Sequence, residues 1–276
     1  MEKSYLFVPG NRTDRVAKAL HSNAEAVIID LEDAVAVEEK EKVRNDVNKL
    51  LKDLSATKKK LYVRINDMNT PFWKKDVHVV ASHPFLGVML PKTNRAEEIR
   101  ALEKELSNQA IIPLIETAKG ILNAYEIASA SSKVKRLAFG ALDYCLDIGI
   151  SHLQSEEALL FPRSTLVVAS RAAGIKPPID TVFSDFRDEK GLTMEAERVK
   201  SLGFYAKLCI HPKQVETINR IFSPTQSEID WAEKVISAFE RAEKKGLAAI
   251  DLDGTMIDYP VYRQALQIKE RANTLS

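Results

Sequence analysis

The sequence predicts an α/β protein of the (β/α)8-barrel (TIM-barrel) class with a C-terminal helical extension. Eight short apolar runs recur along the chain, and each is too continuously apolar for a strand with one solvated face. Segments with helical periodicity separate these runs. A strand followed by a helix, repeated eight times, is typical of a closed parallel barrel with its helices outside.

The eight predicted strands cover residues 5–8, 26–29, 61–65, 87–90, 111–115, 137–139, 179–183 and 206–210. Helical periodicity is clearest over residues 12–22, 38–51, 95–106, 119–130, 164–173, 194–202 and 212–221. The main alternative is an open doubly wound sheet, which carries a glycine-rich phosphate turn after its first strand. Here VPGNR follows that strand instead, which favours the barrel.

The chain beyond residue 222 is extra to the barrel. Ser223-Pro224 interrupts it, residues 227–245 have the pattern of a charged amphipathic helix, and a short apolar piece, a turn and a last helix follow. We therefore expect a barrel domain over 1–222 and an extension over 223–276. The extension either covers the barrel mouth or reaches another subunit.

Composition restricts the partners. The 40 basic and 39 acidic side chains leave a net charge of +1, and no basic block is interleaved with aromatics, so we expect no nucleic-acid partner. No run approaches the roughly 18 apolar residues of a membrane span, and the N-terminus does not resemble a signal peptide. Cys145 and Cys209 lie in apolar runs without metal or redox spacing. We expect buried thiols, no membrane association and a cytoplasmic location.

Polar side chains follow most of the predicted strands, at the end of a parallel barrel where active sites lie. The residues concerned are Asp30, Glu32 and Asp33 after the second strand, Arg64 and Asn66 after the third, Lys92 after the fourth, Glu116 after the fifth, Asp143 after the sixth, and His211 and Lys213 after the eighth. We expect these groups to form the functional site.

Glu116 and Asp143 follow adjacent strands, so their carboxylates can converge on one cation. Mg²⁺ is commonly held by one or two carboxylates together with waters and substrate oxygens. The alternative is that Glu116 caps the next helix while Asp143 makes a salt bridge. Chemistry alone does not separate these two interpretations.

Arg64 also has two interpretations. A strand-end arginine suits bidentate capture of a substrate carboxylate, yet it equally suits neutralisation of the preceding acidic cluster. Strand alternation would send Asp30 and Glu32 to one side and Asp33 to the other. His211 is a candidate base, but Pro212 opens a helix directly after it, which favours a structural histidine in a tight turn.

One motif in the extension points to different chemistry. The segment AAIDLDGT at 248–255 resembles the nucleophile motif of haloacid-dehalogenase-type phosphatases, with Asp251 and Asp253 as nucleophile and acid. That motif opens a domain, whereas here only 21 residues follow Thr255. We therefore do not expect phosphatase activity.

Several motifs in fixed order resemble the citrate lyase β-subunit branch of the HpcH/HpaI aldolase/citrate lyase family. They are LFVPGNR at 6–12, VIIDLEDAV at 27–35, VRIN at 63–66, VMLPKT at 88–93, PLIETAKGILNAYEIA at 113–128, LAFGALD at 137–143, PRS at 162–164, the region from IDTVFSDFRD to LCIHPKQV, and DGTMIDYP at 253–260. The resemblance runs from the first strand into the extension.

This resemblance implies a (β/α)8 barrel that binds Mg²⁺ and cleaves a 3-hydroxy-carboxylated acyl thioester of the citramalyl, malyl or citryl type. The products are a keto acid and a shorter acyl thioester. By position, Glu116 and Asp143 match metal ligands, with Glu116 also beside the substrate. Arg64 matches the arginine that holds the substrate carboxylate, and Asp30 and Glu32 match acidic residues near the metal.

The resemblance also implies partners. Asp258 matches an acidic residue that a neighbouring subunit supplies, which implies a homo-oligomer, commonly a trimer or a multiple of three. Arg12 lies in the segment expected to recognise coenzyme A. The thioester is carried either by coenzyme A or, in a larger complex, by an acyl carrier protein.

Two positions depart from the family pattern. Leu142 stands where the family usually has a glutamate beside the metal ligand, and Ala206 stands where it usually has glycine. Leu142 either retunes metal affinity or substrate choice, or marks a noncatalytic barrel that only binds a thioester.

Overall fold

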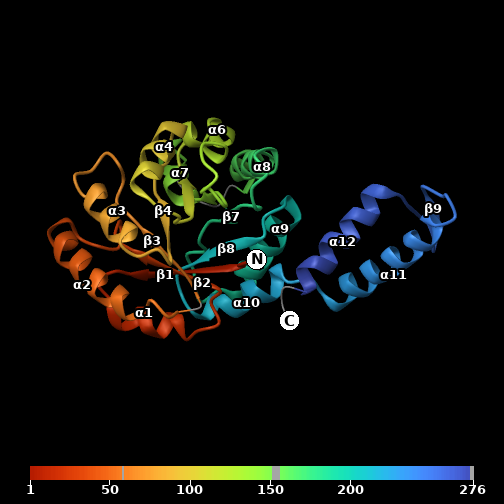
Figure 1. Cartoon of the computed structure of the whole chain (residues 1–276), viewed down its shortest axis with the longest axis horizontal. Coiled ribbons are helices and arrows are strands. Elements are labelled where there is room, and N and C mark those ends of the chain that lie inside the picture. The colour runs from red at the N-terminus through yellow and green to blue at the C-terminus, as the bar shows by residue number, and fades with distance from the viewer. Residues whose placement is uncertain (58, 151–155, 274–276) are drawn as a thin grey trace. The chain divides into compact units, whose positions relative to one another are not determined.

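The computed structural model describes residues 1–57, 59–150 and 156–273. Eight parallel strands close into a barrel in chain order, which confirms the predicted fold class (Figure 1). They are β1 (Ser4–Pro9), β2 (Ala26–Asp30), β3 (Lys60–Arg64), β4 (Leu86–Leu90), β5 (Ile111–Ile115), β6 (Ala138–Phe139), β7 (Ile179–Asp180) and β8 (Ala206–Cys209). Each lies within or overlaps one predicted strand.

Helices cover the outside of the barrel. They are α1 (Thr13–Leu20), α2 (Lys40–Asp53, after the 3-10 turn η1 Val37–Glu39), α3 (Trp73–Ala81), α4 (Ala96–Glu105), α5 (Ala118–Leu122), α6 (Ala124–Ala128), α7 (Ala141–Asp147), α8 (Glu156–Ala172), α9 (Glu189–Leu202) and α10 (Lys213–Phe222). The single helix expected over 119–130 is two short helices, because Asn123 leaves helical geometry with φ −100° and ψ 13°.

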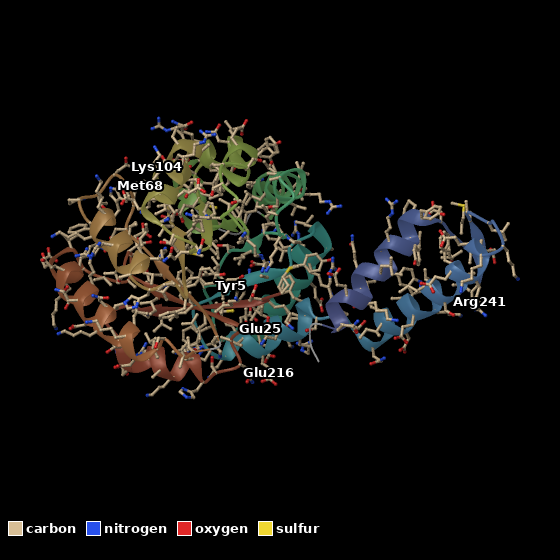
Figure 2. The ribbon with its side chains drawn as sticks, viewed as in Figure 1. Tyr5, Glu25, Met68, Lys104, Glu216 and Arg241 are labelled. Carbon is tan, nitrogen blue, oxygen red and sulfur yellow. The ribbon has the colours of Figure 1, made fainter. Side chains whose placement is uncertain are left out.

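Side chains from all eight strands fill the barrel interior. The interior cluster contains Tyr5, Ala26, Ile28, Tyr62, Met89, Ile112, Leu114, Ala138, Ile179, Ala206 and Leu208. Figure 2 shows Tyr5 in the middle of the barrel, whereas the exposed Lys104 lies at its edge. The barrel is therefore a packed core, and its open space lies beyond the strand ends.

A buried ionic cluster joins β7 and β8 to the helices outside them. Asp180 forms ion pairs with Arg163 Nε at 2.9 Å and Lys207 Nζ at 2.6 Å, and all three side chains are at most 2% exposed. Although burial by itself raises a carboxyl pKa, the two cations hold the pKa of Asp180 below its usual value. Their strand neighbours Ile179 and Leu208 belong to the interior cluster, so Asp180 and Lys207 face the surrounding helices and not the barrel interior.

A second buried pair joins α2 to α3. Arg44 Nε lies 2.6 Å from Asp76 Oδ1, and Asp76 also accepts hydrogen bonds from the Asn66 backbone and side-chain nitrogens at 2.9 and 2.6 Å. An exposed pair joins the same two helices, with Lys75 Nζ 3.8 Å from Glu41 Oε2.

We expect Asp76→Ala to lower the free energy of unfolding by about 3–5 kcal/mol, because it leaves the Arg44 guanidinium buried without its partner. Glu41→Ala, the matched exposed control, should cost less than about 1 kcal/mol. Urea denaturation of both variants measures the difference. Equal costs would mean that the buried pair does not stabilise the barrel.

Residues 221–276 form a second compact unit, distinct from the unit of residues 2–220. It contains α11 (Gln226–Glu243), a hairpin of β9 (Ile250–Leu252) and β10 (Thr255–Ile257), and α12 (Tyr259–Asn273). Its core includes Ala232, Val235, Phe239, Ile257 and Ala265. The sequence had predicted the two helices and a turn but not the second hairpin strand. No helix of the described residues is long and apolar enough to cross a membrane.

Candidate functional site

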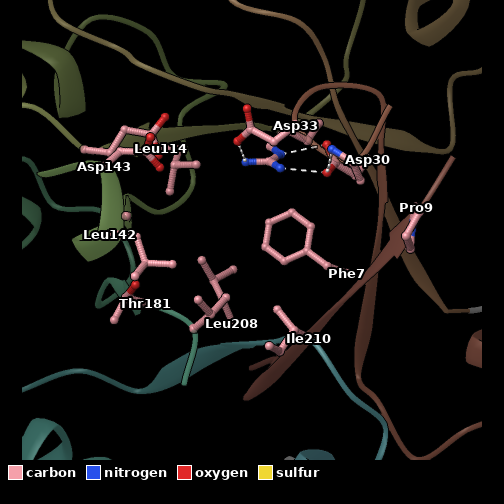
Figure 3. Close-up of a pocket in the computed structure, with 15 residues that line it drawn as sticks. Phe7, Pro9, Asp30, Asp33, Leu114, Leu142, Asp143, Thr181, Leu208 and Ile210 are labelled. Atoms are coloured by element: carbon pink, nitrogen blue, oxygen red, sulfur yellow. Dashed lines mark hydrogen bonds and ion pairs between the residues drawn. The ribbon is translucent and has the colours of Figure 1, made fainter. Parts of the chain in front are cut away.

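A cavity of about 290 Å³ opens at the carboxyl ends of the strands (Figure 3). Its walls come from β1, β2, β3, β5, β8 and the segments that follow β2, β5, β6, β7 and β8. The lining residues are Phe7, Pro9, Asp30, Asp33, Ala34, Arg64, Leu114, Glu116, Gly140, Leu142, Asp143, Thr181, Val182, Leu208 and Ile210. The structure thus brings Asp30, Arg64, Glu116 and Asp143 to one cavity.

Arg64 is held by the acidic residues that follow β2. Asp30 and Arg64 are register partners at the ends of β2 and β3, and they form a bidentate ion pair at 2.8 and 2.6 Å. Arg64 Nη1 also lies 3.0 Å from Glu32 Oε2 and 3.3 Å from Asp33 Oδ2. The guanidinium lies over the Phe7 ring, 5.0 Å from its centroid. These contacts raise the pKa of Arg64 despite its burial.

The alternation expected for the acidic cluster was wrong beyond Asp30. Arg64 contacts Glu32 and Asp33 alike, because β2 ends at Asp30 and the chain then turns. Asp30 stabilises this turn by accepting the backbone N–H groups of Glu32 and Ala34 at 2.9 and 3.2 Å. Glu32 itself is buried and does not line the cavity.

Lys92 links the two halves of the charged region. Its Nζ donates to Glu32 Oε1 at 2.7 Å, and its backbone N–H donates to Glu116 Oε1 at 2.7 Å. The backbone of Lys92 is left-handed, with φ 47°, a conformation that costs energy for a side-chain-bearing residue. This strained turn after β4 aims the N–H group at Glu116.

Glu116 lines the cavity and does not cap the following helix. Thr117, not Glu116, caps α5 by accepting the Gly120 N–H at 3.0 Å. A Cβ atom on Gly140 would lie 2.7 Å from the Glu116 Cβ, so only glycine leaves room for this carboxylate. Asp143 sits in the first turn of α7, and within the described part of the chain no ion pair of Asp143 is found.

The site concentrates buried negative charge. Burial, together with the nearby Asp143 and Glu32 carboxylates, raises the pKa of Glu116 to about 8. Burial likewise raises the pKa of Glu32 to about 7, although Arg64 and Lys92 oppose the shift. A carboxylate pair under these conditions is stabilised by a bound cation.

Buried donors hold the loop that carries these acids. Lys40 Nζ donates to the carbonyl oxygens of Leu31 and Glu32 at 3.0 and 2.9 Å, and Asn66 Nδ2 donates to Leu31 at 2.9 Å. Asn66 is in turn fixed by Asp76. The buried pair between α2 and α3 therefore also supports the loop after β2.

The other predicted residues lie outside the cavity lining. Arg12 is exposed and pairs with Asp14 at 3.0 Å, directly after β1. Asp258 lies in the second unit, where it caps α12 by accepting the Val261 N–H at 3.2 Å. His211 stacks on Phe186 at 4.7 Å, and its Nδ1 accepts the Lys213 N–H at 3.2 Å, which fits the structural interpretation.

Sequence reasoning did not assign roles to Phe7, Lys92 and Gly140. Lys92 stood at a strand end, but its backbone contact with Glu116 carries no sequence signal. Gly140 is part of the LAFGALD motif, but the requirement for glycine there follows only from the space that the Glu116 side chain occupies. In the sequence Phe7 is one apolar strand residue among many, and its contact with Arg64 is apparent only in the structure.

Comparisons with known proteins identify the family of this chain. The family model of the HpcH/HpaI aldolase/citrate lyase family matches residues 3–212, which is more than half of the chain. This chain belongs to the HpcH/HpaI aldolase/citrate lyase family. The family is one of aldolases and lyases, so the protein is an enzyme of carbon–carbon bond chemistry, in keeping with the predicted reaction class.

Relatives within the HpcH/HpaI aldolase/citrate lyase family cover nearly the whole chain. Citrate lyase subunit beta of Leuconostoc mesenteroides subsp. cremoris is 34% identical over 284 residues, which is 99% of this chain and 94% of that protein. Mitochondrial citramalyl-CoA lyase of Rattus norvegicus is 30% identical over 296 residues, or 99% of this chain and 86% of that one. These matches confirm the predicted citrate lyase β-subunit branch.

A solved structure of the same family has the same fold. Protein CitE from Mycobacterium tuberculosis, in complex with magnesium, acetoacetate and coenzyme A, superposes with a TM-score of 0.83 at 31% identity. The superposition covers 99% of this chain and 98% of that chain. The match therefore extends beyond the barrel into the second unit.

Proposed function

We propose that this protein is a Mg²⁺-dependent carbon–carbon lyase that cleaves a 3-hydroxy-carboxylated acyl thioester into a keto acid and a shorter acyl thioester. One observation carries the proposal: two carboxylates, Glu116 and Asp143, share a cavity with Arg64. A cation site beside a carboxylate-binding arginine is what this cleavage requires. Relatives named as citrate and citramalyl-CoA lyases support the same reaction.

The residues present fit Mg²⁺. Among the described residues no group of three or more His, Cys, Asp or Glu side chains is arranged to hold a metal ion. Mg²⁺ does not need such a group, because it keeps several waters and binds through one or two carboxylates plus substrate oxygens. The raised pKa of Glu116 reflects its burial beside Asp143, and a bound cation would stabilise both carboxylates. Glu116 and Asp143 would hold the ion.

Arg64 and Asp30 orient the substrate. When bound, magnesium supplies Lewis-acid polarisation of the substrate hydroxyl and carboxylate oxygens. Arg64 binds the carboxylate through Nη1, where Asp33 is the weakest and most exposed of its present partners. Asp30 keeps both of its oxygens on the guanidinium and so fixes the plane in which Arg64 presents its donors.

Two proton transfers complete the reaction. The substrate hydroxyl loses a proton, and the carbon next to the thioester carbonyl gains one after the bond breaks. We assign the second transfer to Asp258 of a neighbouring subunit. Asp30 lines the cavity, and Glu32 acts on the site through Arg64 and Lys92.

The direct test is to incubate the purified protein with Mg²⁺ and citramalyl-CoA, malyl-CoA or citryl-CoA and to measure keto acid release. We expect release from at least one coenzyme A thioester. If only an acyl carrier protein thioester is cleaved, the protein is the β-subunit of a larger lyase. If a thioester binds but no keto acid forms from either carrier, the noncatalytic barrel suggested by Leu142 is correct.

The proposal includes an oligomer, a trimer or a multiple of three, in which the extension completes a neighbour's site. Large apolar side chains are exposed on α5, α7 and α8, including Leu122, Leu146 and Phe161 at 62–79% exposure, which supports a protein interface. We also propose a cytoplasmic location, which the free, buried Cys145 and Cys209 support. Arg12 remains a candidate for coenzyme A binding.

Mixing variants tests the shared site. Arg64→Ala and Asp258→Ala homo-oligomers should both be inactive. Mixtures co-refolded at equal amounts should regain about a quarter of wild-type activity, because a site is intact only where a subunit that keeps Arg64 adjoins one that keeps Asp258. Keto acid release measures the rescue. If oligomers shown to be mixed by mass spectrometry recover nothing, Asp258 does not act across subunits.

Gly140→Ala should lower kcat/KM about 100-fold, because the added methyl displaces the Glu116 carboxylate by a large fraction of an ångström. Gly149→Ala is a control in which the added Cβ meets no atom within 4 Å, although its φ of 73° strains any side chain. Steady-state keto acid assays measure both. Comparable activity of Gly140→Ala and wild type would remove Gly140 from the account.

A further inference from the structure

The cavity is divided into a charged side and an apolar side. Figure 3 shows Asp30, Asp33 and Asp143 on one side, with Leu208 and Ile210 on the other. Arg64 and Glu116 belong to the charged side by their contacts with these acids. This division gives the substrate two different surfaces to meet.

The apolar side is itself buried at its base and exposed at its edge. Its base, which we call the apolar floor, is formed by Leu114, Val182 and Leu208, which all pack in or against the interior cluster of the barrel. Leu114 and Leu208 are only 2% and 3% exposed. The edge is formed by Leu142 and Ile210, which are 46% and 42% exposed.

The floor offers nothing to a second substrate carboxylate. Arg64 is the one cation among the described lining residues, and its donors already face Asp30 and Asp33. Thr181, an uncharged polar residue of the described lining, accepts the Ala141 N–H at 3.0 Å. A carboxylate on the floor would therefore be buried without a cation, whereas an alkyl group would gain apolar contact.

In a substrate of the proposed function, the carbinol carbon bears a hydroxyl, a carboxylate, a methylene leading to the thioester, and a fourth substituent. The first two groups need the charged side. The thioester arm continues to a large carrier, so it has to leave the cavity over the exposed edge. The fourth substituent is then left against the apolar floor.

We infer that the apolar floor selects thioesters whose carbinol carbon carries one carboxylate and a small alkyl group. This inference rests on the proposed function and specifies its substrate. Cleavage breaks the bond between the carbinol and methylene carbons, and its electron pair passes to the methylene carbon, which takes up a proton. The hydroxyl gives its proton to a base, and the carbinol carbon becomes the ketone of an alkyl 2-oxo acid.

The test compares four coenzyme A thioesters that differ only in the fourth substituent, which is hydrogen, methyl, ethyl or carboxymethyl. We expect kcat/KM for the methyl compound to exceed that for hydrogen by about 10-fold or more, as a buried methyl group allows. It should exceed the carboxymethyl compound by about 100-fold or more, because that charge stays unpaired.

The outcomes separate the inference from the function on which it rests. Cleavage of all four compounds with hydrogen or carboxymethyl preferred overturns the inference and leaves the lyase assignment intact. Release of keto acid from none of them, on coenzyme A or on an acyl carrier protein, overturns the proposed function and the inference with it.

Variants locate the selectivity on the floor. Leu208→Ala should raise the ethyl-to-methyl ratio of kcat/KM about 10-fold, because it enlarges the floor by a buried side chain. Ile210→Ala, on the exposed edge, is the matched control and should change all four rates alike. Val182→Ala repeats the test with less loss of core packing if Leu208→Ala does not fold. An unchanged ratio in the folded floor variant contradicts the inference.

Discussion

Glu116→Gln should lower keto acid release at saturating substrate by about a thousandfold. The amide keeps an acceptor for the Lys92 N–H, but it removes the negative charge that a cation requires, and Lewis-acid stabilisation contributes several kcal/mol. Because burial disfavours the charged form of Glu116, the variant should unfold at the same temperature as wild type or higher. Activity assays, Mg²⁺ titration calorimetry and thermal unfolding measure the three quantities.

Glu126→Gln on α6 is a suitable control, since it makes the same chemical change at an exposed position. It should leave activity and Mg²⁺ affinity unchanged. Near-normal cleavage by Glu116→Gln, with an unaltered dependence on Mg²⁺, would show that the metal is held elsewhere or is not needed.

Arg64→Lys should reduce kcat/KM by about 10²–10³-fold although the positive charge is kept. Lysine cannot reproduce the bidentate contact with Asp30 at 2.8 and 2.6 Å while also offering planar donors to a substrate carboxylate. Mg²⁺ affinity in the absence of substrate should change little. Steady-state kinetics and calorimetry on the same preparation distinguish the two effects.

The control for Arg64→Lys is Arg12→Lys, which changes an exposed arginine paired with Asp14. It should raise KM for coenzyme A thioesters with little effect on kcat, because Arg12 lies outside the cavity. An Arg64→Lys enzyme with wild-type kcat/KM would mean that Arg64 serves only to neutralise Asp30, Glu32 and Asp33.

The barrel could be predicted because its strands are buried on both faces. Continuous apolar runs such as 111–115 therefore mark the strands. The parallel arrangement then places the polar residues that follow the strands at one end of the barrel. Short elements were harder. The β10 strand has three residues and polar neighbours, and the break at Asn123 depends on local geometry, so neither leaves a periodic signal.

The site was predicted as a set of residues but not as a network. Glu116 Oε1 accepts a hydrogen bond from the backbone N–H of Lys92, 24 residues away, and such contacts are set by tertiary packing. The structure is compatible with both interpretations of Arg64, because its guanidinium contacts Asp30, Glu32 and Asp33 while Arg64 also lines the cavity. Spacing along the chain contains neither fact.

The central claim is that Glu116 and Asp143 hold the magnesium ion beside a substrate carboxylate bound by Arg64. A crystal structure of the protein grown with Mg²⁺ and a 2-oxo acid tests it most directly. We predict an octahedral ion with oxygen ligands from Glu116 and Asp143 and the oxo acid carboxylate on Arg64. An ion bound away from these two carboxylates, or an oxo acid outside this cavity, would contradict the claim.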